Sequence, residues 1–300
     1  MSPGEPERDA IQDGVSAEGL VDSADDEEAH ESVRNRGAAS IIAQGRRRGW
    51  KDLEEPDRGR LRLLELRRVF VSPGDLAADA AVIGGEAHHH LVHVLRVRVG
   101  EHIALLDGLG GAWEAMVEGA DRRALRARLV GPLAALPEPA VGVTVAQALG
   151  KGDRFEQVVQ HATEMGAAAF VPLVTQRTVV RIDPRDVEAK RARWRQIARG
   201  AAEQAGRARV PVVEPPATLE TVAGRFGEFG AAILLHPEAP RLGALASGTE
   251  SVLLLVGPEG GFAPNELERA AAAGARLASL GLYVLRTETA ALAALSRILA

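Results

Sequence analysis

The chain has 300 residues, of which 46% are hydrophobic and only 3% aromatic, and its formal net charge is −5. This length allows about two ordinary domains, each with a core built mainly from Ala, Val, Leu and Ile. The absence of cysteine excludes disulfides, thiol nucleophiles and thiolate metal ligands, and no apolar run reaches the ~20 residues of a membrane span.

The first 66 residues predict a disordered, acidic extension. They hold 16 Asp and Glu against 10 Lys and Arg, and no apolar period is sustained among them. Only the stretch Leu61 to Leu66 has the pattern of a marginal helix. This acidic start also lacks the apolar segment of a secretory signal, which together with the absence of cysteine favours a cytoplasmic protein. We expect residues 1–66 to be dispensable.

Order is expected from residue 67 onward, beginning with a small β-rich barrel. The predicted strands are 67–71, 101–106, 112–118 and 124–130, and the predicted helix is Glu86–Arg96 with Leu91, Val94 and Leu95 on one face. Asp107-Gly108-Leu109-Gly110 is similar to a cofactor-binding glycine loop, but a strand follows it rather than a helix. We therefore interpret it as a hairpin turn. Prolines 132, 137 and 139 mark a linker.

Strands and helices alternate in the rest of the chain. The predicted strands are 141–145, 168–174, 210–213, 231–236, 252–256 and 277–281, and the predicted helices are 155–165, 183–205, 218–226 and one that begins at Pro264. Such alternation is typical of an α/β domain with a mostly parallel sheet. Residues 151–210 hold 12 Lys and Arg against 7 Asp and Glu, which indicates either a surface for a polyanion or a solvated helix face.

Three of these strands end in unusual loops. The apolar run Ser251–Val256 stops at Gly257-Pro258-Glu259-Gly260-Gly261, the strand before it stops at Pro237-Glu238, and the last strand leads into Arg286-Thr287-Glu288-Thr289. The carboxyl ends of parallel strands share one edge of a sheet, and glycine lets the backbone approach a ligand closely. We predict one shared pocket. A tight turn alone would explain the glycines, but not three such loops.

The histidines at 88–90 and 93 suggest a metal site, because His89 and His93 are one helical turn apart. A closed zinc site needs four nitrogen or sulfur ligands, and no third well-spaced ligand is present. We predict no metal. Contact with RNA, together with the neighbouring Arg96, explains the cluster at least as well.

Several motifs occur together in a fixed order. They are His88-His89 with Leu91 and Val94-Leu95-Arg96, Gln147-Ala148-Leu149, Lys151-Gly152-Asp153-Arg154, Thr163-Glu164-Met165-Gly166, Glu203-Gln204-Ala205-Gly206-Arg207, Leu235-His236-Pro237-Glu238, Gly257 to Phe262, and Val284 to Ala290. This series, over about residues 67–300, resembles the bacterial 16S ribosomal RNA uridine-N3 methyltransferase family (small subunit methyltransferase E) of the SPOUT superfamily. Two positions depart from it: Leu282-Tyr283 replaces a Pro-Arg-like pair, and Gln176 replaces an acidic residue.

The resemblance implies a PUA-like RNA-binding barrel at 67–134 and a SPOUT α/β domain with a deep trefoil knot at 140–300. It also implies a homodimer that binds S-adenosylmethionine in a bent form and methylates N3 of a specific uridine in the decoding region of the small ribosomal subunit. The implied cofactor-binding residues are Leu235, His236, Pro237, Glu238, Gly257, Pro258, Glu259, Gly260, Gly261, Leu280, Gly281, Val284, Leu285, Arg286, Thr287 and Thr289. The RNA-binding candidates are Arg68, His89, Arg96, Lys151 and Arg154.

The reaction sets requirements of its own. Uridine N3 carries a proton at neutral pH, so the protein needs a base, or cations that lower the pKa of N3. Arg154, Arg207 and Arg286 are expected to stabilise negative charge on the uracil carbonyl groups. Glu203 and Glu288 are the candidate bases, although Glu288 could instead favour the start of a helix capped by Thr287. The competing functions are a non-catalytic RNA-binding protein and a related SPOUT enzyme that methylates a ribose 2′-hydroxyl.

Overall fold

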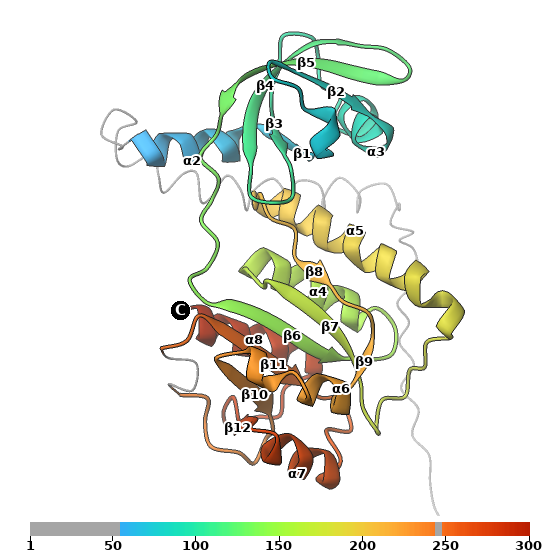
Figure 1. Cartoon of the computed structure of the whole chain (residues 1–300), viewed down its shortest axis with the longest axis vertical. Coiled ribbons are helices and arrows are strands. Elements are labelled where there is room, and N and C mark those ends of the chain that lie inside the picture. The colour runs from blue at the N-terminus through green and yellow to red at the C-terminus, as the bar shows by residue number, and fades with distance from the viewer. Residues whose placement is uncertain (1–54, 244–247) are drawn as a thin grey trace, which may run out of the picture. The chain divides into compact units, whose positions relative to one another are not determined.

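The computed structural model describes residues 55–243 and 248–300, in which a β-rich domain precedes an α/β domain (Figure 1). The expectation for residues 1–54 lies outside the described residues. Among the helices in the described residues, none combines the length and apolarity that a membrane span needs.

Helix α2 (Glu55–Glu65) corrects the predicted boundary of the extension. The prediction of disorder is wrong from residue 55 onward, since Leu63 is fully buried and Leu66 is 8% exposed. Arg62 donates two hydrogen bonds to Glu114 Oε1 at 3.2 and 2.6 Å, and this guanidinium holds the pKa of Glu114 below its usual range. The helix is thus stabilised by tertiary contacts that its own sequence pattern does not reveal.

The first domain is built on a five-stranded sheet with the order β1-β3-β4-β5-β2. Its strands are β1 (Arg67–Phe70), β2 (Ala80–Gly84), β3 (His102–Leu106), β4 (Ala112–Ala120) and β5 (Ala124–Pro132). The four predicted strands are confirmed, and Asp107 Oδ1 accepts hydrogen bonds from the N–H groups of Leu109 and Gly111, as in a hairpin turn. Strand β2 escapes prediction because its short apolar run has no alternation.

The predicted helix at Glu86–Arg96 is only partly regular. Helix α3 (Gly85–His89) continues into a π-helical turn at His90–Val94, and Arg96 takes a positive φ of 52° that ends it. Leu91 is buried in the core of the first domain, but Val94 is 59% exposed. The prediction of one regular helix with Leu91 and Val94 on the same face is therefore wrong, because a π turn shifts the side chains that follow it.

The second domain contains a seven-stranded sheet with the order β12-β10-β11-β6-β7-β8, and β9 pairs separately with β7. Its strands are β6 (Gly142–Ala148), β7 (Ala169–Val174), β8 (Val212–Val213), β9 (Ala217–Thr218), β10 (Ala231–Leu235), β11 (Ser251–Val256) and β12 (Arg276–Ala278). The helices are α4 (Arg154–Met165), α5 (Val187–Ala205), α6 (Leu219–Ala223), α7 (Pro264–Ala272) and α8 (Thr287–Leu299). Every pairing in this sheet is parallel, which confirms the predicted α/β class.

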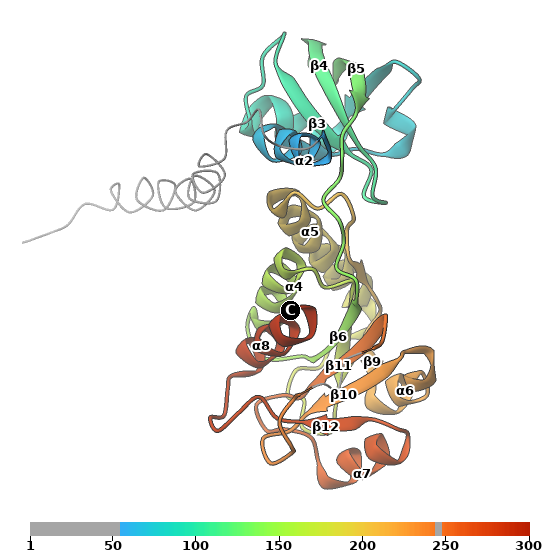
Figure 2. The same cartoon turned by 90° about the vertical axis from the view of Figure 1, so that its left-hand side faces the viewer.

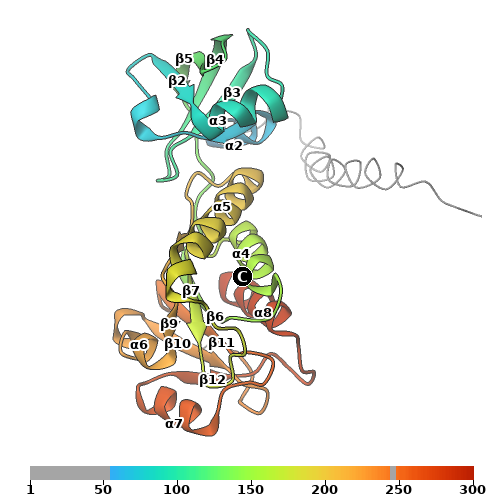
Figure 3. The ribbon, with the colours of Figure 1, turned by 90° about the vertical axis from the view of Figure 1, so that its right-hand side faces the viewer.

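Helices cover both faces of this sheet. Helices α4, α5 and α8 lie on one side and α6 and α7 on the other, as the side views show (Figures 2 and 3). Strand β11 alternates accordingly: Val252, Leu254 and Val256 enter the first core, and Leu253 and Leu255 enter the second. Both faces of the sheet are therefore buried, and a ligand can reach it only at the strand ends.

Arg207, just after α5, joins three segments of the second domain. Its side chain is almost fully buried, and its Nη1 donates to the carbonyl oxygens of Thr163 at 2.7 Å and Ala167 at 3.0 Å. The same guanidinium forms an ion pair with Glu138 in the proline-rich linker. The loss of these bonds would leave buried acceptors without donors, which costs about 1–3 kcal/mol each.

Replacing Arg207 by Ala should lower the free energy of unfolding by about 2–4 kcal/mol, because two buried carbonyls and one carboxylate lose their partner. Urea unfolding followed by circular dichroism measures this change. Arg269→Ala is the matched control, since its ion pair with Glu220 is exposed on both sides, and it should change stability by less than about 0.5 kcal/mol. Equal stability losses in the two variants would contradict this assignment.

Candidate functional site

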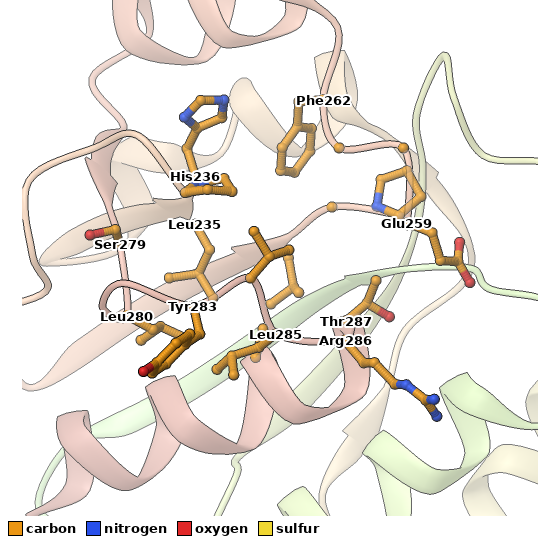
Figure 4. A pocket seen from close by; sticks show the side chains of 18 of the residues that line it. Leu235, His236, Glu259, Phe262, Ser279, Leu280, Tyr283, Leu285, Arg286 and Thr287 are labelled. Carbon is orange, nitrogen blue, oxygen red and sulfur yellow. The ribbon is translucent and has the colours of Figure 1, made fainter.

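The carboxyl ends of β10, β11 and β12 enclose a pocket of about 650 Å³. Its walls come from the loops that follow these strands and from the first turns of α8 (Figure 4). The three strand ends that the sequence pattern singles out therefore do meet in one place. The walls combine apolar side chains, such as Leu235 and Leu280, with the exposed backbone of a glycine loop.

The three glycines of the loop Gly257–Gly261 differ in whether the fold requires glycine at their positions. Gly261 has a φ of +67°, which other residues rarely adopt, and a Cβ at Gly257 would lie 3.0 Å from the ring of Phe262. Gly260 is different, because a Cβ there would meet nothing closer than Arg177 Cδ at 3.5 Å. The fold alone does not require glycine at position 260. The space that a side chain would fill there is therefore available to a ligand.

Two arginines hold the glycine loop in position from neighbouring strand ends. Arg177, which follows β7, donates from Nη1 to the carbonyl oxygen of Gly260 at 2.6 Å. Arg154, at the start of α4, forms an ion pair with Glu259. Both arginines also line the pocket, so this clamp brings positive charge to its rim.

Glu266 fixes the end of the same loop. Its buried carboxylate accepts hydrogen bonds from the N–H of Ala263 at 2.8 Å and from the N–H of Gln176 at 2.9 Å. The second bond ties the start of α7 to the loop after β7. Because it uses the backbone of Gln176, this contact does not depend on the residue type at position 176.

The third loop, between β12 and α8, is open to solvent. Leu282 and Tyr283 are each 85% exposed, and Val284 is 82% exposed. Arg286 occupies the N-cap position of α8, and Thr287 is the first helical residue, so the prediction that Thr287 caps this helix is wrong. Figure 4 shows Tyr283, Leu285 and Arg286 around this side of the pocket.

Most of the predicted cofactor residues line the pocket. The exceptions are Glu238 and Thr289, which are exposed and lie outside the pocket lining. Two of the predicted catalytic residues, Arg154 and Arg286, also line it, whereas Glu203, Arg207 and Glu288 do not. Glu288 lies in the first turn of α8, where a carboxylate favours the helix, which agrees with the alternative role considered for it.

Glu203 lies near the first domain instead. Its Oε2 accepts a hydrogen bond from the N–H of Phe70 at 3.2 Å, and its Oε1 lies 3.2 Å from His90 Nε2. Burial raises the pKa of Glu203 above its ordinary value. Arg68 binds to the same segment, because its guanidinium donates hydrogen bonds to the carbonyl oxygens of Glu203 and Gln204 at 2.9 and 3.1 Å. Through these contacts Glu203 and Arg68, like Arg207, stabilise the fold at a place outside the pocket.

The remaining RNA-binding candidates His89, Arg96 and Lys151 are exposed. The rings of His89 and His93 lie 4.9 Å apart, while His88 is buried with its Nε2 3.0 Å from the carbonyl oxygen of Asp121. In the part of the chain that the structure describes, no three His, Cys, Asp or Glu side chains are placed to hold a metal ion.

Seven lining residues were not among the predicted site residues: Arg177, Val256, Phe262, Ala278, Ser279, Tyr283 and Ala290. A signal for Arg177 existed, because it follows a strand whose carboxyl end shares the edge of the sheet with the glycine loop. No sequence pattern distinguishes Phe262 or Tyr283 from ordinary apolar residues, since their roles depend on packing and exposure.

Comparison with known proteins agrees with this arrangement. Residues 137–299 match the family model of an RNA methyltransferase domain, and residues 83–130 match that of an RNA methyltransferase PUA domain. Ribosomal RNA small subunit methyltransferase E of Mycobacterium tuberculosis is 39% identical over 73% of this chain and 85% of its own length. The protein of the same name from Bacillus subtilis is 32% identical over 72% of this chain and 88% of its own length.

The fold agrees as well. The crystal structure of a ribosomal RNA small subunit methyltransferase E from Neisseria gonorrhoeae, bound to S-adenosyl methionine, is 30% identical, with a TM-score of 0.71 over 77% of this chain and 95% of that chain. The expected combination of a PUA-type domain with a SPOUT-type α/β domain is thereby confirmed, while the trefoil knot stays a prediction. On this basis the chain belongs to the ribosomal RNA small subunit methyltransferase E family.

Proposed function

We propose that this protein transfers a methyl group from S-adenosylmethionine to N3 of a specific uridine in the decoding region of 16S ribosomal RNA. The observation that carries the proposal is the pocket at the ends of β10, β11 and β12, formed by loops that carry the motifs of the family. The relative from Neisseria gonorrhoeae was solved with S-adenosyl methionine bound, which supports the same cofactor here.

The pocket fits such a cofactor in size and chemistry. Its volume of about 650 Å³ lies within the range of ~300–1,000 Å³ that is usual for small-molecule sites. The leucines at 235, 280 and 285 offer apolar walls for an adenine ring, and the bare backbone of Gly260 offers close polar contact. The bound sulfonium would supply the methyl group, and its leaving group is a neutral thioether that needs no acid.

The protein must still help uridine N3 to lose its proton. Glu259 is the one carboxylate among the described residues that line the pocket, and it is paired with Arg154. We therefore assign the activation of N3 to arginines rather than to a dedicated carboxylate base. A guanidinium beside a uracil carbonyl stabilises the anion and lowers the pKa of N3. Arg286 is the best placed, because its side chain forms no ion pair or hydrogen bond within the described residues.

We further propose that the protein acts as a homodimer on the small ribosomal subunit in the cytoplasm. Helix α8 supports dimerisation through the second domain, because its apolar residues Ala290, Leu292 and Leu299 are only partly buried within one chain.

The decisive test uses 16S ribosomal RNA from cells that lack this gene, both free and within small subunits. The purified protein and S-adenosylmethionine should produce 3-methyluridine, detected by mass spectrometry of nucleosides. A ribose-methylated nucleoside would favour the alternative SPOUT activity. Bound RNA with no methylated product in either substrate would favour a non-catalytic binding protein.

The role of the glycine loop is tested by Gly260→Val. The new side chain would occupy space that we assign to the cofactor, so binding of S-adenosylmethionine should weaken at least ~10-fold while the circular dichroism spectrum stays normal. Calorimetric titration measures the affinity. Gly119→Val in strand β4 is the control, because a Cβ there meets no atom within 4 Å, and it should bind the cofactor normally. Normal binding by the Gly260 variant would show that this loop is only a turn.

Replacing Arg286 by Ala should lower kcat about 100-fold, as the removal of one oxyanion donor does, and should leave cofactor affinity within about twofold. Single-turnover methylation and calorimetry separate the two effects. Arg297→Ala, on an exposed position of the same helix, is the control and should behave like the unmodified protein. If Arg286→Ala loses cofactor affinity and turnover to the same degree, this arginine belongs to the cofactor site and not to the chemistry.

The exposed cations Arg96 and Lys151 should contribute to RNA affinity through phosphates. Each change to Ala should weaken binding similarly for different RNA sequences, and should reduce the slope of log affinity against log salt by about 1. Filter binding at several salt concentrations measures both quantities. The exposed Arg269 on α7 provides the control substitution. Unchanged affinity and slope in both variants would remove these residues from the RNA-binding surface.

A further inference from the structure

Tyr283 has an unusual position for an aromatic residue. It is the only tyrosine of the chain, its side chain is 85% exposed, and it nevertheless lines the pocket. It stands in the loop between β12 and α8, three residues before Arg286 (Figure 4). An aromatic ring that is open to solvent loses the stabilisation that burial would give it, so its exposure at a pocket indicates a role in binding.

The other phenyl ring of the pocket, that of Phe262, cannot offer the same surface. Phe262 is 4% exposed, and its ring packs so closely on Gly257 that a Cβ there would lie 3.0 Å from it. The face of Phe262 is thus used within the protein. Among the phenyl rings that line the pocket in the described residues, Tyr283 alone has its face available to a ligand.

The walls of the pocket also carry positive charge. Arg154, Arg177 and Arg286 line the pocket, and Glu259 is the one acidic residue among its described lining residues. Arg154 is neutralised by Glu259 and Arg177 is engaged with Gly260, so Arg286 is left to meet a ligand. An exposed ring and a free cation on the walls of one pocket suit a nucleic acid, which carries both flat bases and phosphates.

The chemistry of the proposed reaction requires such a surface. N3 lies on the pairing edge of uracil, so the base must be unpaired before it can receive a methyl group. Proteins hold unpaired RNA bases by stacking them on aromatic side chains. Stacking uses the face of the base and leaves its edge, with N3 and both carbonyl groups, free for the methyl donor and for Arg286.

We propose that Tyr283 is the stacking surface for the target uracil at the mouth of the pocket. The inference rests on the proposed function, because it concerns the RNA base that this site would methylate. It assigns a substrate-binding role to a residue of the third loop, three positions before the cation that acts on the same base.

The test compares Tyr283→Leu, which keeps an apolar side chain but removes the flat ring, with Tyr283→Phe, which keeps the ring. Tyr283→Leu should raise KM for unmethylated 16S ribosomal RNA about tenfold, and Tyr283→Phe should stay within about twofold of the unmodified protein. Cofactor affinity by calorimetry and molecular mass by light scattering should be the same in all three. Leu282→Ala, at an equally exposed neighbour outside the pocket lining, is the control and should leave KM unchanged.

A second readout is independent of turnover. In the presence of S-adenosylhomocysteine, an oligouridylate of eight nucleotides should bind Tyr283→Leu about tenfold more weakly than Tyr283→Phe. An unmodified protein that forms no 3-methyluridine would refute the proposed function, while this binding comparison would still decide the role of the ring.

Three results would overturn the proposal. Equal RNA binding by the Leu and Phe variants would show that the flat ring is not used. A loss of cofactor affinity in the Leu variant would place the ring against the adenine of the cofactor. A halved molecular mass in the same variant would mean that a second copy of the chain covers Tyr283.

Discussion

The parallel sheet of the second domain is covered by helices on both faces, and this constraint decides where the protein can bind a ligand. The alternation within β11 fills two separate cores, so the strand itself has no surface to offer. The structure has a pocket at the carboxyl ends of β10, β11 and β12, and there the chain places a glycine loop. Arg177 donates a hydrogen bond to this loop, and Glu266 accepts hydrogen bonds from Ala263, just after the loop, and from Gln176.

The charged residues considered for the site divide into two groups by their partners. Arg207, Arg68 and Glu203 bond to backbone groups inside the protein, so their substitution should act mainly on stability. Arg154 and Arg177 position the glycine loop and also line the pocket, whereas Arg286 lines it without a partner among the described residues. Motif membership alone does not separate these groups, because Glu203 and Arg207 belong to the same series of motifs as Arg154.

The sequence predicts the features that depend on local pattern. Apolar runs give the strands, glycines and prolines give the loops, and the parallel order places three loops at one edge. Features that depend on distant contacts are not predictable in this way. Helix α2 is held by the burial of Leu63 in a cluster from other elements, and the π turn after α3 exposes Val94. The exposure of Tyr283 likewise follows from the path of its loop and not from its neighbours in sequence.

In the proposed function, the backbone of three strand-end loops forms the cofactor site. Hydrogen–deuterium exchange with and without S-adenosylmethionine tests it most directly, because amides that contact a ligand become protected. Bound S-adenosylmethionine should add protection in peptides covering residues 235–238, 256–262 and 279–288, and should change protection little around Glu203 and Arg207. Protection confined to the first domain, or no protection in the loop 257–261 at saturating cofactor, would contradict it.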